Sequence, residues 1–279
     1  MITDGQTNFL YLADSLMTKY PGFYKRFETL VRQHQVPLDI INVTKDLWAV
    51  DYMPIQVAEK RFVQFSYNPD YLRNSLKWQS TLTNVDEVCA LLNIQPIKSN
   101  IILDGGNIVR TNDKVIMCDK VFRENPEYKT KDLIRKLEEL LLVDNIIFIP
   151  TQPKDIIGHA DGMVRFYNND TVLINNYSKE DKNFRANFYS ALKDARLNTI
   201  EIPYSPYDNK NYIDANGIYI NYLHMIKAII IPIFRIKEDE QVVLRFEQLF
   251  KKIAFIDANE IALQGGVLNC ISWNILKTN

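Results

Sequence analysis

Residues 129–150 read KTKDLIRKLEELLLVDNIIFIP, and this stretch shows most clearly how the chain is built. Apolar side chains recur at helical spacing over residues 129–142, which predicts a helix with one apolar face. The apolar run at residues 146–150 is short and rich in isoleucine, as is typical of a buried β-strand. Residues 115–118 (VIMC) predict another strand ahead of the helix. The stretch therefore places a helix between apolar strands.

The same order recurs along the rest of the chain. A helix, a strand, a loop and a pair of strands follow one another five times, with a period of about 55 residues. The units share little sequence, so the prediction rests on the recurring pattern. We predict one domain over residues 1–279, an α/β (α+β) fold that forms a closed ring of five small αβ units. Helices are predicted over residues 21–34, 83–92, 129–142, 181–197 and 238–252, and the strands behind them over residues 37–43, 100–103, 146–150, 199–203 and 253–257.

Composition sets limits on the partners and the compartment. The 279 residues are 47% hydrophobic and carry a net charge of -1, which gives no reason to expect nucleic acid or a membrane as a partner. Cys89, Cys118 and Cys270 are odd in number and widely spaced, which argues against a disulfide framework and for a reducing compartment. No signal peptide and no apolar run long enough to span a bilayer is visible, so we expect a cytoplasmic protein.

Polar residues recur at the same place in each unit, in the loop that follows the strand behind the helix. They lie about one period apart, because each unit contributes one of them. Equivalent loops of a ring meet at one end of its axis, so we expect these side chains to form one pocket. The five residues are Asp51, Asp104, His159, Asn216 and Cys270.

Each candidate also has a structural interpretation. Cys270 follows two glycines and an asparagine, so it is either a nucleophile or a buried core thiol. His159 stands between Gly-rich positions and suits general acid–base chemistry. With Asp161 it could instead begin a metal site, but no second histidine occupies a comparable loop, so we expect no metal. Asp51 and Asp104 could merely close turns, and Trp48 could pack or form a wall of the pocket.

The residue types favour one chemistry. Several carboxylates would oppose the oxyanion that forms in acyl transfer, whereas they match the N–H groups of a planar guanidinium. Asp51 and Asp161 could hold such a group, and its positive charge would favour the thiolate of Cys270. His159 would then protonate the departing nitrogen and activate a water molecule.

Several motifs in the right order resemble the agmatine deiminase and bacterial peptidylarginine deiminase family, over roughly residues 48–273. The motifs are residues 48–51 (WAVD), 104–107 (DGGN), 158–161 (GHAD) with 165–166 (RF), 219–222 (YINY) with 231–232 (IP), and 265–270 (GGVLNC). The resemblance implies a five-bladed αβ propeller (the pentein fold) and a guanidino-modifying enzyme without a cofactor. It also implies that Cys270 is the nucleophile, His159 the general acid and base, and Asp51 and Asp161 the holders of the guanidinium.

The substrate pocket is expected to include Trp48, Asp104, Asn107 and Asn269 as further binding residues. The chain departs from the family pattern at a few positions near the site. Val50 stands where the family has arginine, Met53 where it has glycine, Asp104 where it usually has glutamate, and Asn269 where it has histidine. Ser272 stands where threonine is common, and these changes bear on the substrate beyond its guanidinium.

We therefore predict a C–N hydrolase, a deiminase that converts the guanidinium of agmatine or a related arginine derivative into a ureido group and releases ammonia. An amidinotransferase, a peptidylarginine deiminase and a binding module without activity remain open alternatives, the last because a fold does not fix a function. The expected partner is a small cationic guanidino compound, and a homodimer is left open.

Overall fold

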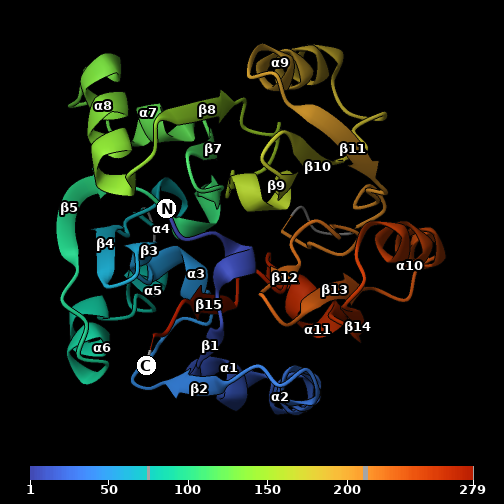
Figure 1. Ribbon diagram of the computed structural model, residues 1–279, viewed down its shortest axis with the longest axis horizontal. Coiled ribbons are helices and arrows are strands. Elements are labelled where there is room, and N and C mark those ends of the chain that lie inside the picture. The colour runs from blue at the N-terminus through green and yellow to red at the C-terminus, as the bar shows by residue number, and fades with distance from the viewer. Residues whose placement is uncertain (74–75, 210–212, 279) are drawn as a thin grey trace.

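The computed structural model describes residues 1–73, 76–209 and 213–278. Within these residues, the strands form five sheets of three strands each. Figure 1 shows the sheets arranged around one axis, with the long helices on the outside. This arrangement confirms the predicted ring of small αβ units.

Each sheet consists of an antiparallel strand pair and a third strand that joins it in parallel. In strand order the sheets are β15 (Ser272–Ile275), β1 (Phe9–Ala13), β2 (Leu38–Ile41); β3 (Ile55–Ala58), β4 (Arg61–Ser66), β5 (Ile97–Ile102); β6 (Val109–Arg110), β7 (Lys114–Cys118), β8 (Asn145–Ile149); β9 (Val164–Asn168), β10 (Thr171–Asn175), β11 (Asn198–Ile202); and β12 (Leu223–His224), β13 (Ile229–Ile233), β14 (Ile253–Asp257).

A longer helix precedes the parallel strand of every sheet, because parallel neighbours need a crossover connection. These helices are α2 (Pro21–Gln33), α6 (Val85–Leu91), α8 (Thr130–Leu141), α9 (Lys182–Asp194) and α10 (Glu238–Leu249), close to the predicted bounds. Asn84 and Asp181 cap two of them, since their side chains accept backbone N–H groups of the first turn. Shorter helical segments lie outside the strands and the five longer helices: η1 (Asp4–Gln6), α1 (Asp14–Lys19), α3 (Ala49–Tyr52), α4 (Asp70–Arg73), α5 (Leu76–Gln79), η2 (Gly105–Asn107), α7 (Lys120–Glu124), η3 (Ala160–Gly162) and α11 (Asn259–Ala262).

The first sheet joins the two ends of the described chain, which the repeat pattern did not predict. β15 pairs antiparallel with β1, and the rings of Tyr11 and Trp273 lie 5.2 Å apart across this pair. The predicted units begin at a helix, whereas each sheet begins at the strand pair before its helix. The order of elements was therefore right, and the boundaries between units were shifted by one strand pair.

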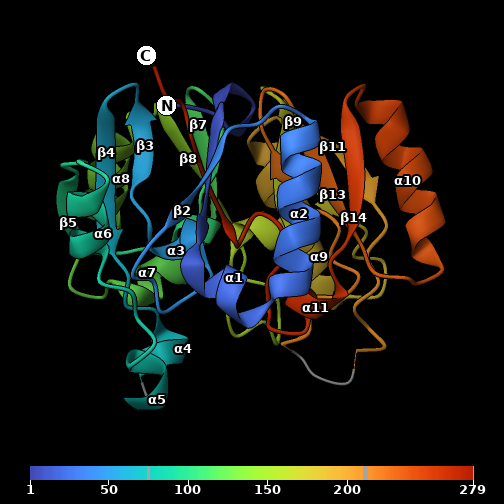
Figure 2. The same ribbon diagram turned by 90° about the horizontal axis from the view of Figure 1, so that it is seen from below.

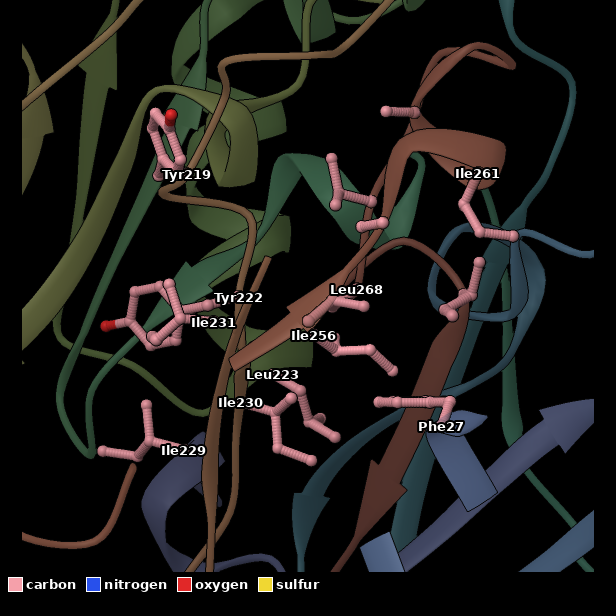
Figure 3. Close-up of a cluster of buried hydrophobic side chains, with 14 of the residues drawn as sticks. Phe27, Tyr219, Tyr222, Leu223, Ile229, Ile230, Ile231, Ile256, Ile261 and Leu268 are labelled. Atoms are coloured by element: carbon pink, nitrogen blue, oxygen red, sulfur yellow. The ribbon is translucent and has the colours of Figure 1, made fainter. Parts of the chain in front are cut away.

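Apolar packing between helices and sheets fixes the turn that carries Cys270. Figure 3 shows part of the largest buried cluster, in which Phe27 of α2, Ile230 of β13 and Ile256 of β14 gather around Leu268. Burial of each such side chain contributes about 1.5–3 kcal/mol. Leu268 stands two residues before the thiol, so the core holds the backbone of this turn in place.

The two ends of the ring carry different parts of the chain. Figure 2 shows α3, α7, α11 and the projecting pair α4–α5 toward one end, while both termini lie at the other. The loops that follow β2, β5, β8 and β14 belong to the first of these ends. In the part of the chain that the structure describes, none of the helices combines the length and apolar character needed to cross a membrane.

Candidate active site

A cavity of about 340 Å³ lies among the loops at the end of the ring opposite the two termini. Its wall includes the two residues to which the sequence assigns the main chemistry, His159 and Cys270, together with Asp161. Asn221 and Gly266 also line it. The cavity therefore collects side chains from segments more than a hundred residues apart in the sequence.

The thiol of Cys270 lies on a turn that is held by one asparagine. Asn221 accepts hydrogen bonds at its Oδ1 from the backbone N–H groups of Asn269 (3.0 Å) and Cys270 (3.3 Å). The Sγ atom of Cys270 lies 3.7 Å from Oδ2 of Asp161. Burial raises the pKa of the Cys270 thiol well above its usual range, and the carboxylates of Asp161 and Asp51 add to the shift. Both effects favour the protonated thiol over the thiolate.

His159 lies between two carboxylates. Its Nε2 atom is 2.8 Å from Oδ2 of Asp104, and its Nδ1 atom is 3.4 Å from Oδ1 of Asp51. Burial acts to lower the pKa of His159, but Asp51 and Asp104 outweigh it and raise the pKa to about 9. The imidazole is therefore a charged proton donor at neutral pH.

Asp51 and Asp161 are buried carboxylates, and the positive charge near them does not offset the effect of burial on their pKa values. Burial, together with the neighbouring carboxylates of Asp104 and Asp161, raises the pKa of Asp51 to about 8, against the opposing effect of His159. Burial also raises the pKa of Asp161, against the opposing effect of His159. The site is thus deficient in positive charge, which a cationic ligand would supply.

Comparison with known proteins identifies the family. Residues 14–275 match the profile of the Porphyromonas-type peptidyl-arginine deiminases. The chain belongs to this family.

Individual relatives agree with this assignment. A protein of Mycoplasma mycoides subsp. mycoides SC, named as a candidate agmatine deiminase, is 23% identical over 268 residues, which cover 81% of this chain and 74% of the relative. The solved structure of C. jejuni agmatine deiminase is similar with a TM-score of 0.81 at 19% identity, and the match covers 99% of this chain and 95% of that one. A cysteine-to-serine variant of the same enzyme with substrate bound matches with a TM-score of 0.79, 18% identity and coverage of 99% and 96%. These likenesses confirm the pentein fold.

Three of the four residues that the sequence assigns to substrate binding, Asp104, Asn107 and Asn269, make side-chain hydrogen bonds inside the protein. Asp104 contacts His159, and the Nδ2 atom of Asn269 donates to Oδ2 of Asp161 at 2.7 Å. Asn107 accepts from the backbone N–H groups of Cys118 (2.7 Å) and Ala160 (3.3 Å). The described residues that line the cavity do not include these three residues or Trp48. A direct contact of the four with substrate stays a prediction, and the geometry favours support of the residues that face the cavity.

The glycines of this family signature admit close contacts. A Cβ atom on Gly266 would lie 2.5 Å from the ring of Trp48 and 2.9 Å from Cβ of Cys270. Gly265 has a φ of 100°, a conformation that other residues rarely adopt. Gly266 therefore lets Trp48 pack directly against the turn that carries the thiol, and Gly265 supplies the backbone conformation that the turn needs.

Other residues of the site carried a weaker signal in the sequence. Asn216 does not line the cavity and bonds to Asp214, which does, whereas Asn221 lines the cavity and holds the Cys270 turn. Lys120 was missed: it is almost fully buried and lies 3.4 Å from Asp104. Its spacing of four residues from Glu124 was the one sign of an ion pair in the sequence, and this spacing does not indicate burial. Among the described residues, no group of three or more His, Cys, Asp or Glu could hold a metal ion.

Gly106→Ala is expected to damage the pair of Asp51 and His159. The new Cβ atom would lie 2.6 Å from both Oδ1 of Asp51 and Nδ1 of His159, which real contacts do not allow. We expect a loss of about 1–3 kcal/mol in the free energy of unfolding from overpacking, and a fall of about 100-fold in turnover from displaced catalytic groups. Chemical denaturation and a turnover assay measure the two effects.

Gly22→Ala is the matched control, because a Cβ atom there meets only the flexible end of Arg26, at 3.6 Å. It should keep wild-type turnover, and its stability should equal or slightly exceed that of the wild type, because alanine is favoured over glycine within a helix. Wild-type behaviour of Gly106→Ala itself would contradict the close packing of Gly106 against Asp51 and His159.

Proposed function

We propose that this chain is a deiminase that hydrolyses the guanidinium group of agmatine or a related arginine derivative. The observation that carries the proposal is the placement of the Cys270 thiol 3.7 Å from the Asp161 carboxylate, in a cavity that His159 also lines. The family to which the chain belongs and the substrate-bound C. jejuni agmatine deiminase support it. We propose further that residues 1–279 act as one catalytic domain of five repeats.

The first step uses the charge of the substrate. A guanidinium between Asp51 and Asp161 supplies the positive charge that the buried carboxylates lack, and it lowers the pKa of Cys270. The thiol then gives its proton to water, and the Sγ atom attacks the central guanidinium carbon. This proton converts the ammonia released later in the step to ammonium. The carbon becomes tetrahedral, His159 gives a proton to one terminal nitrogen, and the C–N bond breaks to release ammonia.

The second step removes the product from the enzyme. His159, now neutral, takes a proton from a water molecule, and the resulting hydroxide attacks the carbon of the S-linked thiouronium intermediate. The C–S bond breaks, the departing sulfur takes the proton of the added hydroxyl group, and the neutral ureido product leaves while His159 keeps the proton it took from water. One water is consumed for each ammonia released, and no redox step or cofactor enters the balance.

The remaining assignments concern support, partners and location. Asp104 orients His159, Asn269 orients Asp161, Asn107 holds the backbone beside His159, and Trp48 packs under the thiol turn. The partner is a small cationic guanidino compound, with a homodimer left open. A cytoplasmic location is proposed because the described cysteines are unpaired, as suits a reducing compartment.

A substrate panel tests the proposal. Ammonia release and ureido formation would be measured with agmatine, free arginine, methylated arginines and arginyl peptides, each with and without an amine acceptor. Turnover of one compound to a ureido product is expected. Transfer of the amidino group to the acceptor instead would identify an amidinotransferase, and no turnover of any compound would count against the proposal.

Alkylation of Cys270 gives an independent prediction. The neutral reagent iodoacetamide should label it slowly at pH 7.5, because the pKa of the thiol is raised and little thiolate is present. The cationic reagent 2-chloroacetamidine should label it at least about 100-fold faster, because binding between the carboxylates brings the charge that favours thiolate. Mass spectrometry of the labelled peptide measures both rates, and equal rates for the two reagents would contradict a cation-binding site.

A further inference from the structure

Lys120 is a buried cation behind the imidazole, and the sequence motifs do not include it. Its side chain is 1% exposed, and its Nζ atom lies 3.4 Å from Oδ2 of Asp104, the same oxygen that bonds Nε2 of His159. A buried ammonium that serves only for packing is rare, because taking the charge out of water costs several kcal/mol. Its contacts therefore indicate what it does.

The contacts of Lys120 connect three segments around His159. Besides Asp104, its Nζ atom donates to the backbone carbonyl of Ile157 at 2.7 Å, two residues before the histidine. It also lies 5.2 Å from the ring centre of Tyr71, whose ring meets that of His159 edge-on at 6.4 Å. One ammonium thus holds the carboxylate partner, the preceding loop and an aromatic neighbour of the imidazole.

Glu124 balances part of this charge from the same helix. Its Oε1 atom lies 3.5 Å from Nζ of Lys120 and also accepts the backbone N–H of Asp70 at 3.1 Å. Asp70 itself lies at 4.0 Å from Nζ of Lys120. Burial acts to lower the pKa of Lys120, but Asp104, Glu124 and Asp70 outweigh it and hold the pKa above its usual range. The lysine therefore stays charged.

We propose that Lys120 is a positioning residue for His159, which it acts on through Asp104 and through the Ile157 carbonyl. Asp104 is ionised although it is buried, because its bonds to His159 and Lys120 outweigh the effect of burial on its pKa. With Nε2 fixed by this carboxylate, only the Nδ1 edge of the imidazole, beside Asp51, is left to exchange protons with substrate and water. Lys120 fixes this orientation without lining the cavity, and the inference rests on the proposed deiminase function.

The test compares Lys120→Met/Glu124→Gln with Glu124→Gln alone, so that no buried carboxylate of the helical pair is left without its cation. Lys114→Met, on a half-buried lysine of β7 that donates to the Asn169 carbonyl, is the control and should match wild type. Relative to Glu124→Gln, we expect kcat to fall about 30–100-fold, as for a displaced catalytic group, with KM unchanged because Lys120 lies outside the cavity.

A second readout needs no turnover. The chain has three histidines, so NMR of histidine-labelled protein with a His159→Gln reference assigns His159. Loss of the cation should raise the pKa of His159, since Lys120 acts to lower it while Asp51 and Asp104 raise it. A lower kcat together with a shifted titration supports the inference. Wild-type kcat, or an unchanged titration whatever the kcat, overturns it.

Two safeguards keep the test decisive. If the methionine variant does not fold, Lys120→Arg takes its place, because a planar guanidinium keeps the charge but cannot reproduce both the Asp104 and the Ile157 contacts. Reduced kcat and an altered His159 titration in that variant support the inference, and wild-type values overturn it. Failure of the proposed function is recognised separately, as absence of turnover in the wild-type protein with every compound of the panel.

Discussion

Cys270→Ser is expected to abolish turnover while the protein keeps its fold and its ability to bind the substrate. A serine hydroxyl has a far higher pKa than a thiol, so the positive charge of the substrate does not bring it to the ionised form that attacks. Loss of a nucleophile typically lowers kcat by about 10⁴-fold or more. The measurement is single-turnover kinetics with the best substrate of the panel, together with calorimetric binding of that substrate to the variant.

Cys89→Ser is the matched control. Cys89 is a buried thiol on α6, in an apolar cluster that includes Val85 and Trp273. The new hydroxyl should lower the free energy of unfolding by about 1–3 kcal/mol if it finds no partner, and leave kcat unchanged. If Cys270→Ser kept a normal rate, Cys270 would be a core thiol and the proposed nucleophile would be wrong.

The ring could be predicted because its signal is repeated. The helical period over residues 129–142 and the apolar strand at residues 146–150 recur in every unit, so an error in one unit does not alter the pattern. The first sheet escaped prediction because β1 and β15 lie at opposite ends of the chain, and each has only four or five residues. Pairing between distant short strands leaves no local trace in a sequence.

The positions of the main site residues could also be predicted, and their neighbours only in part. Asp51, His159, Asp161 and Cys270 stand in equivalent loops, and ring geometry brings such loops together. The roles of second-layer residues depend on side-chain direction, which spacing does not give. Asn107 is an example. It lies in one of the equivalent loops, but its amide oxygen accepts the backbone N–H groups of Cys118 and Ala160 and does not face the cavity.

Lys120 is a second residue whose role could not be predicted from its spacing in the sequence. In the sequence it resembles any helical lysine with a glutamate four residues later, a pair that normally lies in solvent. Its burial follows from α7 lying behind the loops of His159 and Asp104, and this is a property of the assembled ring. Residues that act through a neighbour are therefore the ones that sequence motifs miss.

Asp161→Asn is expected to separate activity from stability. The asparagine has nearly the same shape, and its Oδ1 can still accept the hydrogen bond that Asn269 donates to Asp161 at 2.7 Å. What is lost is a negative charge facing the ligand. Truncating one side of a buried charge pair costs about 2–5 kcal/mol, which corresponds to a fall of roughly 30-fold to several thousand-fold in kcat/KM.

The stability of the Asp161→Asn variant without substrate should stay the same or rise, in contrast to its activity. The pKa of Asp161 is raised in the folded state, so its ionised form disfavours folding at pH values above its unfolded pKa, and more so as the pH rises toward the folded value. The neutral asparagine removes this penalty, and thermal unfolding at pH 8 should show a melting temperature no lower than that of the wild type. Unfolding of the variant would instead make Asp161 a structural residue.

The reactivity of Cys270 in the Asp161→Asn variant decides most directly whether Asp161 binds the ligand or is a structural residue. Asp161 and Asp51 both raise the pKa of the thiol, so removal of one charge should increase the thiolate fraction and speed labelling by neutral iodoacetamide. The same change removes a binding group for 2-chloroacetamidine, so labelling by the cationic reagent should slow. A purely structural aspartate would alter both rates in the same direction, because a loosened site exposes the thiol to either reagent. Opposite changes arise only if the carboxylate acts on both the thiol and the ligand.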